Sequence, residues 1–555
     1  MDRKLETDHI LQIGPTNWQG EVTIPEGLNW HYFSIQTPLQ IEDYMAEQGI
    51  KQFKALVLDH PERLLNFKEE LALFQPYTVF YDQTYDQESF TEELARLMQL
   101  VQAKAWDFSD KAHFLYQLHR FLYDGQYGDA FSVRDLRIRA DFEGMQTVRG
   151  KHFLELDGSY GEEFTPIAQW VNTYSYNGTI PTDLWLEYEK TAGCQIRLRV
   201  QFFQSGSLGS LEKELVYSEV DLVRPVLIDE PGRYYLSFSL EARGQGQLII
   251  GALHKRFSHG PFGEISLGSQ TLRDSKRQEI FAYFHPGDLK PPLNIYFSGY
   301  RPAEGFEGFY LMKNMGAPFI LFSDPRLEGG CFYLGSPELE KKIQDFIDYH
   351  LQALGFGPKE LNFSGLSMGT YGALYYGASY SPHAILVGKP IVNLGDVAAN
   401  LKFKRPDEFG TSLDMMQLLV GQVTSEGIEV LNKRFWDRFG QVTLKDTLLA
   451  LAYMRDDDYD QKAYSDILEA LYHQPVRIIS SSRPGRHNDA TESIIEWFLT
   501  QYKEIMERDF GRSGWLGWEN RKVARFIGDQ PLRQIIYGGL LFRDWQSIRF
   551  GLRIL

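Results

Sequence analysis

Hydrophobic and polar residues change their spacing along the chain, and each change predicts a different kind of domain. Residues 1–145 mix short apolar runs with a longer segment, 89–124, whose apolar positions recur at helical spacing. The short runs, FKALVLDH and YTVFYDQ, are typical of buried strands. We therefore expect a small α/β and helical domain over residues 1–145.

The segment 146–275 alternates apolar and polar residues and is rich in aromatic and β-branched types. Its runs are DLWLEYEK, CQIRLRVQFF, RYYLSFSLEA and QLIIGALHKRF, separated by Gly, Ser, Asn or Pro. This spacing predicts an antiparallel β-sandwich. The large rings of this segment suggest either a carbohydrate-binding surface or ordinary core, and core is favoured because such rings are mostly buried. The rings concerned are Trp170, Tyr174, Tyr176 and Trp185.

From 285 to 500 the pattern changes to short, strongly apolar runs that alternate with helical segments. The runs are NIYFSGY, FILFSD, ELNFSG, AILVGKP, LLALAYM and VRIISS, and the helical segments include SPELEKKIQDFIDYHLQAL and TESIIEWFLTQYKEI. Uniformly apolar strands with helical crossovers predict a parallel sheet that is covered on both faces. In such a sheet, chemistry is expected at the carboxyl ends of the strands.

Composition limits the partners that the chain can bind. A chain of 555 residues is too long for one hydrophobic core, and its net charge of −17 argues against a general nucleic-acid binder. The last segment, 501–555, is different, because it holds ten Lys and Arg against six Asp and Glu. This basic helical tail could contact an acidic partner, an anionic membrane surface or the acidic body of the protein, although a solvated helical face is the simpler interpretation.

The sequence predicts a cytosolic protein. Its first residues include no apolar stretch of signal-peptide length, and no window approaches a membrane span. Cys194 and Cys331 are the two cysteines, far apart and outside any CxxC pattern. They fit a reducing compartment and offer neither a disulfide framework nor a thiolate zinc site.

The pentapeptide GLSMG, residues 365–369, fits G-x-S-x-G, the nucleophile elbow. Alone the motif is a weak signal, but a buried strand is predicted before it and a helix after it. Gly365 and Gly369 stand where a sharp strand-turn-helix needs minimal side chains. Ser367 is therefore either a nucleophile exposed above the sheet or only a serine in a tight turn.

A serine nucleophile needs a base and an acid that orients the base. After Ser367 come an apolar strand that ends in the aspartates 456–458 and 460, a helix, another strand, and a polar loop with His487. This is the order Ser, Asp, His of α/β-hydrolases. The sequence alone does not decide among Asp456, Asp457 and Asp458. His383 and His473 fall at other positions, and no metal site is expected because no second ligand cluster accompanies the aspartates.

An oxyanion hole is the remaining requirement. The backbone N–H of Met368, directly after the nucleophile, is one expected donor. Gly299 and Tyr300, which follow the run NIYFS, are the candidates for the second, unless this segment is only a tight turn. Arg301 could instead bind an anionic group. The fold class expected is thus α/β, with an α/β-hydrolase-like catalytic domain over 285–500 preceded by the α/β and β-sandwich domains.

Four segments together resemble the second of the accessory Sec system proteins of Gram-positive cocci: FSGYRPAEGFEGFY, GLSMGTYGALYYGA, MRDDDYD and SSRPGRHND. The resemblance covers the full chain. It implies a cytosolic protein that helps to export serine-rich repeat glycoproteins and O-acetylates their N-acetylglucosamine residues. The implied partners are the first and third Asp-type components, the accessory Sec ATPase and the glycoprotein itself, with peripheral membrane contact near the translocon as an option.

The resemblance also assigns roles. The family's triad falls on Ser367, His487 and an acid in the run 456–458, where Asp457 matches best. No tightly bound cofactor is implied, but an acetyl donor is required, for which acetyl-CoA is a candidate. Two alternatives remain open: a carbohydrate esterase or deacetylase with the same triad, and an export adaptor without catalysis.

Overall fold

The computed structural model describes residues 8–34, 41–66, 68, 70–206, 209–404 and 409–513. Contacts divide the described residues into two compact units. The first is made of residues 8–129 and 256–513, and the second is made of Ala130–Lys255. The predicted boundaries at 145 and 275 do not coincide with this division. The reason lies in strand pairing: strands before 145 join the sheet of the second unit, and strands from 270 onward join a sheet of the first.

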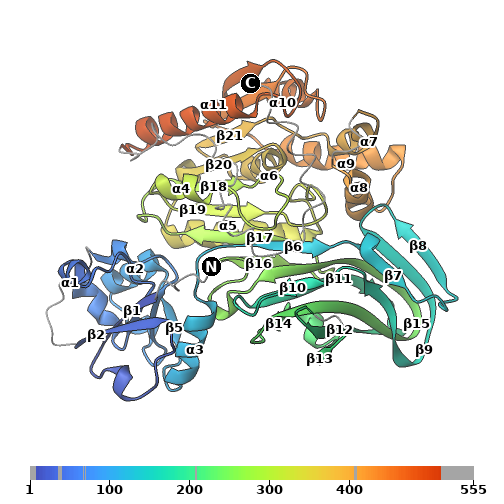
Figure 1. Ribbon diagram of the computed structural model, residues 1–555. Helices are drawn as coiled ribbons and strands as arrows, with labels where there is room; N and C mark the ends of the chain where they lie inside the picture. The colour runs from blue at the N-terminus through green and yellow to red at the C-terminus, as the bar shows by residue number, and fades with distance from the viewer. Residues whose placement is uncertain are drawn as a thin grey trace, which may run out of the picture. The chain divides into compact units, whose positions relative to one another are not determined.

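The first unit begins with a five-stranded parallel sheet in the order β2-β1-β3-β4-β5. Its elements are β1 (Asp8–Gly14), β2 (Leu28–Ser34), α1 (Ile41–Gln48), β3 (Ala55–Leu58), β4 (Val79–Asp82), α2 (Glu92–Val101), β5 (Lys104–Trp106) and α3 (Lys111–Phe121) (Figure 1). The helix-like segment 89–124 is therefore interrupted by a strand. Gln102 ends α2 in a left-handed conformation, with φ of 48°, and the chain then pairs with β4 as β5.

The second unit is built on a ten-stranded antiparallel sheet with β15 at its centre, and Figure 1 shows the long curved strands β9 and β15. The predicted β-sandwich would consist of two packed sheets, whereas these strands form one connected sheet. They are β6 (Gly128–Phe131), β7 (Leu136–Ile138), β8 (Met145–Arg149), β9 (Phe153–Trp170), β10 (Tyr174–Tyr176), β11 (Thr182–Lys190), β12 (Cys194–Gln204), β13 (Leu211–Ser218), β14 (Val226–Ile228) and β15 (Tyr234–Phe257).

The aromatic rings of this unit belong to its core. Trp170, Tyr176 and Trp185 are each at most 2% exposed. Trp170 and Tyr176 belong to one core cluster, and the partly buried Tyr174 packs against it. Every second residue of β12, from Cys194 to Phe202, is buried as well. Burial of these rings favours the interpretation that they are ordinary core residues.

An eight-stranded sheet completes the first unit in the order β16-β17-β19-β18-β20-β21-β22-β23. Strands β18 to β23 run parallel to one another, whereas β17 pairs antiparallel with both β16 and β19. The strands are β16 (Gln270–Arg273), β17 (Glu279–His285), β18 (Leu293–Phe297), β19 (Phe319–Ser323), β20 (Leu361–Leu366), β21 (Ala384–Gly388), β22 (Leu448–Met454) and β23 (Arg477–Arg483). The prediction of a mixed α/β fold with a parallel sheet and antiparallel sheets is confirmed.

Helices connect these strands, and those between Pro337 and Leu471 contribute to a large apolar core with them. They are α4 (Phe309–Asn314), α5 (Pro337–Leu354), α6 (Met368–Gly377), α7 (Leu394–Lys404), α8 (Ser412–Val420), α9 (Ser425–Phe439), α10 (Ala463–Leu471) and α11 (Thr491–Glu504). A π-helical turn, Ile505–Asp509, follows α11. The predicted basic tail lies outside the described residues from 514 onward. Within the described part of the chain, no helix has the length and apolar character needed to cross a membrane.

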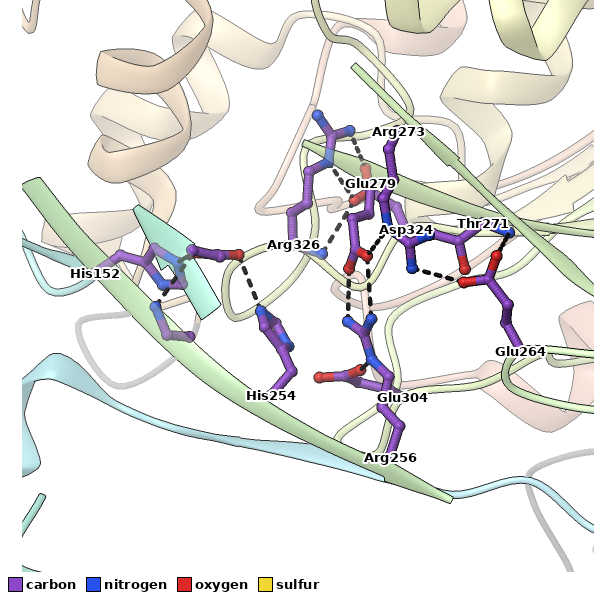
Figure 2. A network of polar contacts seen from close by, with 12 residues as sticks. His152, His254, Arg256, Glu264, Thr271, Arg273, Glu279, Glu304, Asp324 and Arg326 are labelled. Atoms are coloured by element: carbon purple, nitrogen blue, oxygen red, sulfur yellow. Dashed lines mark hydrogen bonds and ion pairs between the residues drawn. The ribbon is translucent and has the colours of Figure 1, made fainter. Parts of the chain in front are cut away.

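A buried ion network joins three segments of the first unit (Figure 2). Arg256 is 4% exposed and pairs with Glu279 on β17 and with Glu304 in the loop after β18. Arg273 on β16 donates to the same Glu279 at 2.8 Å and pairs with Glu264. Arg256 thereby fixes the loop after β18 to the edge of the sheet.

The variant Arg256→Met should lose about 3 to 5 kcal/mol of unfolding free energy, because it removes the buried cation that Glu279 and Glu304 share. Urea unfolding followed by circular dichroism measures this loss. Lys341→Met, which removes an exposed pair with Asp345, is the matched control and should cost about 1 kcal/mol or less. Equal losses in the two variants would contradict the structural role of the network.

Candidate active site

The nucleophile candidate lies in a tight turn between β20 and α6. Ser367 separates the end of β20 at Leu366 from the start of α6 at Met368. Its φ of 51° and ψ of −118° are unusual for a residue other than glycine. Its N–H donates to the carbonyl of Gly388, at the end of β21, over 2.8 Å. The turn therefore holds Ser367 in a strained conformation at the carboxyl end of the parallel sheet.

The two glycines of the motif are required by space. A Cβ at Gly365 would lie 2.3 Å from the carbonyl oxygen of Gly369, and a Cβ at Gly369 would lie 2.0 Å from the carbonyl oxygen of Phe297. Both obstacles are backbone atoms, which cannot rotate away. The motif is thus explained by close approach of α6 to β18 and β20.

Ser367, His487 and Asp457 form a continuous chain of contacts. Ser367 Oγ lies 2.8 Å from Nε2 of His487. The other ring nitrogen, Nδ1, lies 2.8 Å from Oδ2 of Asp457. His487 is 1% exposed and Asp457 6%, whereas Ser367 is partly exposed. The side chains have the geometry in which an acid orients a histidine and the histidine accepts the serine proton.

The three adjacent aspartates have different partners. Asp457 contacts the imidazole, Asp458 Oδ1 accepts the backbone N–H of His487 at 3.1 Å, and Asp456 Oδ2 accepts the N–H of Gly485 at 3.2 Å. Asp457 Oδ1 also accepts the N–H of Tyr459 at 2.9 Å, which fixes the carboxylate. The geometry therefore favours Asp457 among the three.

Sheet topology explains how these residues meet. Ser367 follows β20, Asp457 follows β22 and His487 follows β23, and these strands are parallel. The carboxyl ends of parallel strands lie at one edge of a sheet. His383 and His473, which the sequence analysis set aside, do not belong to this group. His383 pairs with Asp509, and His473 is exposed.

The predicted second oxyanion donor is corrected by the structure. The N–H of Gly299 donates to Oε2 of Glu307 at 2.7 Å, so it does not point freely at a substrate. The Gly299 backbone does lie beside the elbow, since a Cβ there would be 3.2 Å from the carbonyl oxygen of Leu366. Tyr300, which is 53% exposed, is left as the candidate of this loop, with Met368 at the start of α6.

Arg301 takes part in the same loop. Its Nη1 donates to the carbonyl of Phe306, and burial lowers its pKa while Glu307 opposes that change. The guanidinium of Arg301 therefore stabilises the loop after β18.

Two charged residues near the site were not predicted from the sequence. Glu307 accepts hydrogen bonds from Gly299 N–H and from the Tyr296 hydroxyl, and burial raises its pKa. Lys389 is 5% exposed and follows β21 directly. A charged residue immediately after an apolar strand was the available signal for Lys389. Glu307 lies in the quoted segment FSGYRPAEGFEGFY, but spacing alone does not show that it reaches Gly299.

The last aspartate of this run, Asp460, is bound by backbone groups of the loop after β21. Asp460 accepts the backbone N–H groups of Val392 and Asn393 at 2.8 and 2.7 Å. No group of three or more His, Cys, Asp or Glu side chains in the described ranges is placed to hold a metal ion.

Reaction of Ser367 with a fluorophosphonate tests the triad. Asp457→Asn should slow labelling by roughly three to four orders of magnitude, because an amide no longer holds the histidine in the productive tautomer. Asp456→Asn is the matched control and should stay within a few-fold of wild type, since Asp456 bonds Gly485 and not the imidazole. The labelling rates of the two variants are measured by mass spectrometry. Equal slowing in both variants would refute the assignment of Asp457 as the acid of the triad.

Comparison with known proteins identifies the family. The model of the family described as Asp2, accessory Sec system GspB-transporter, matches residues 8–512. The Accessory Sec system protein Asp2 of Streptococcus gordonii is 41% identical over 91% of this chain and 98% of its own length. Its counterpart from Staphylococcus aureus (strain NCTC 8325 / PS 47) is 38% identical over 91% of this chain and 97% of its own length.

A solved structure agrees with the sequence comparison. A chain of the Glycosylation Associate Protein (Gap123) complex from Streptococcus agalactiae superposes with a TM-score of 0.86 and 36% identity, covering 92% of this chain and all of that one. The resemblance predicted from the four motifs is therefore confirmed. The chain belongs to the Asp2 family of the accessory Sec system.

Proposed function

We propose that this protein is an O-acetyltransferase of the accessory Sec system, which acetylates N-acetylglucosamine on serine-rich repeat glycoproteins. The observation that carries the proposal is the contact chain from Ser367 Oγ through His487 to Asp457, with 2.8 Å at each step. A serine held in a strained turn against a buried histidine and carboxylate is suited to nucleophilic acyl transfer.

The topology of the eight-stranded sheet supports an α/β-hydrolase-like catalytic domain. Counted along the chain from β16, the nucleophile follows the fifth strand, the acid the seventh and the histidine the eighth. The chain order Ser, Asp, His and the strand-turn-helix at the serine are those of α/β-hydrolases.

The first half-reaction acetylates the enzyme. Nε2 of His487 takes the proton of Ser367 Oγ while the oxygen attacks the acetyl carbonyl of the donor. The N–H of Met368 and a second donor, for which Tyr300 N–H is the candidate, stabilise the oxyanion. Collapse breaks the bond to the leaving group, which receives the proton from His487. Acetyl-CoA is the proposed donor, so the leaving group would be a thiol.

The second half-reaction transfers the acetyl group to sugar. His487 takes the proton of a sugar hydroxyl, whose oxygen attacks the ester carbonyl on Ser367, and then returns the proton to Ser367 Oγ. Water can attack the same ester, and its attack would make the protein an esterase. Transfer therefore requires that sugar be bound before water reaches the ester.

Family membership supports a role for this chain within the accessory Sec system. The similar chain from Streptococcus agalactiae is part of a complex named Gap123. We propose that this chain likewise works with the first and third Asp-type components and the accessory Sec ATPase in the cytosol. Peripheral contact with an anionic membrane surface is a further proposal for the basic segment 501–555.

Mass spectrometry of the glycans on a co-expressed serine-rich repeat glycoprotein tests the proposal. Ser367→Ala should abolish the acetyl mass increment while partner binding, measured by co-purification, stays at the level of wild type. Ser381→Ala, away from the triad, is the control and should keep the increment. Unchanged glycans in Ser367→Ala would favour the export adaptor, and acetate release without transfer would favour the esterase.

A further inference from the structure

Tyr459 is an aromatic residue beside the triad to which the proposed mechanism gives no role. Its ring lies against the imidazole of His487, with 4.4 Å between the ring centroids and 35° between the ring planes. At this angle the two rings meet more nearly face to face than edge to face. Tyr459 is itself partly exposed, whereas His487 is 1% exposed. The tyrosine ring therefore covers one face of the base.

The backbone of Tyr459 holds the acid of the triad. Its N–H donates to Oδ1 of Asp457 at 2.9 Å, and the N–H of Asp460 donates to the same oxygen at 3.2 Å. The other carboxylate oxygen of Asp457, Oδ2, contacts Nδ1 of His487. One residue thus contacts two members of the triad, the acid through its backbone and the base through its ring.

The next residue, Asp460, anchors this loop to the loop after β21. Its Oδ2 accepts the N–H groups of Val392 and Asn393, and its Oδ1 accepts Nδ2–H of Asn393 at 3.1 Å. Oδ1 of Asn393 in turn accepts Nε1–H of Trp436 on α9 at 2.9 Å. Asp460 and Asn393 are 6% and 5% exposed. Buried hydrogen bonds therefore fix the chain directly after Tyr459, and with it the place of the ring.

A ring in this place restrains the base. Rotation about the Cβ–Cγ bond of His487 would carry Nε2 away from Ser367 and Nδ1 away from Asp457. A second ring packed against the face of the imidazole opposes that rotation, and a base must keep its geometry to within a fraction of an ångström to react efficiently.

The same ring also favours the charge that forms during the reaction. As Ser367 Oγ forms its bond to the acetyl carbon, its proton passes to Nε2 of His487 and the imidazole becomes a cation. The face of an aromatic ring carries partial negative charge and attracts a cation. The Tyr459 ring therefore stabilises the transition state more than the resting enzyme, in which the imidazole is neutral.

We propose that Tyr459 is a positioning residue for the base of the triad: its ring holds the imidazole of His487 in line with its two partners and stabilises its positive charge as Ser367 reacts. The inference rests on the proposed use of the triad for acyl transfer. The contact between the rings carries it, and the backbone bond to Asp457 supports it. This role belongs to the ring and not to the hydroxyl, so phenylalanine should replace tyrosine.

Labelling of Ser367 by a fluorophosphonate, followed over a range of reagent concentrations, tests the role of the ring. The maximum labelling rate and the half-saturating concentration are obtained separately, and the final extent of labelling counts the active sites. Tyr459→Leu keeps an apolar side chain without an aromatic face. It should lower the maximum rate about tenfold and leave the half-saturating concentration within about twofold of wild type. Tyr459→Phe should return the maximum rate to within about threefold of wild type.

Tyr464→Leu is the matched control, because Tyr464 is also a partly exposed tyrosine in a stacked pair. Its ring lies 3.8 Å from that of Tyr453, with 11° between the ring planes, and not against the base. Its loss should leave the maximum rate within about twofold of wild type. Tyr459→Met provides a second side chain without an aromatic face if the leucine variant fails to fold, as judged by circular dichroism.

Slow labelling in Tyr459→Leu with rescue in Tyr459→Phe is the expected result. Equal maximum rates in the leucine variant and wild type would overturn the role of Tyr459 and leave the triad intact. Equal slowing in the leucine and phenylalanine variants would overturn it too, as would a change confined to the half-saturating concentration, because the residue would then bind the reagent. Wild type that reacts no faster than Ser367→Ala would overturn the proposed function and, with it, this inference.

Discussion

The tight turn between β20 and α6 is the constraint on which the rest of the site depends. It forces Ser367 into a conformation with φ of 51°, and it leaves no room for a Cβ at Gly365 or Gly369. Such strain is kept only where the surrounding structure fixes it. Here the residues of α6 are buried along its whole length, and β18 and β21 contact the turn through Phe297 and Gly388. The partners of the serine follow β22 and β23, which lie further along the same run of parallel strands.

Much of this arrangement could be predicted from the sequence. The uniformly apolar runs predict a parallel sheet, and the order Ser, Asp, His places the three residues after strands of that sheet. The choice of Asp457 over Asp456 and Asp458 could not be derived from spacing. Successive residues in a loop point in different directions, and only the folded loop shows which carboxylate faces Nδ1 of His487. The resemblance to a known family supplied that choice.

Contacts between distant segments were the part that sequence patterns could not reveal. The bond between Gly299 and Glu307, which removes Gly299 from the predicted oxyanion donors, depends on how the loop after β18 folds back. The strand β5 inside a helix-like segment depends on a left-handed Gln102 and on pairing with β4. In both cases local propensity is overridden by a tertiary partner.

The buried charges of the site help to separate an enzyme from an adaptor. Asp457, Asp460, Glu307 and Lys389 are held at one edge of the sheet in an environment that raises the pKa of Glu307 and Asp460 and lowers that of Lys389. Burying ionisable groups generally costs stability, and clusters of this kind gather at catalytic sites. An adaptor surface has no need of them.

The central claim is that Ser367 carries the acetyl group during transfer. The most direct measurement is mass spectrometry of the peptide containing Ser367, after the protein has been incubated with acetyl-CoA without a sugar acceptor and quenched in acid. An acetyl group should be found on Ser367, and it should disappear when the glycoprotein is added. A peptide that remains unmodified, or an acetyl group that the acceptor does not remove, would contradict it.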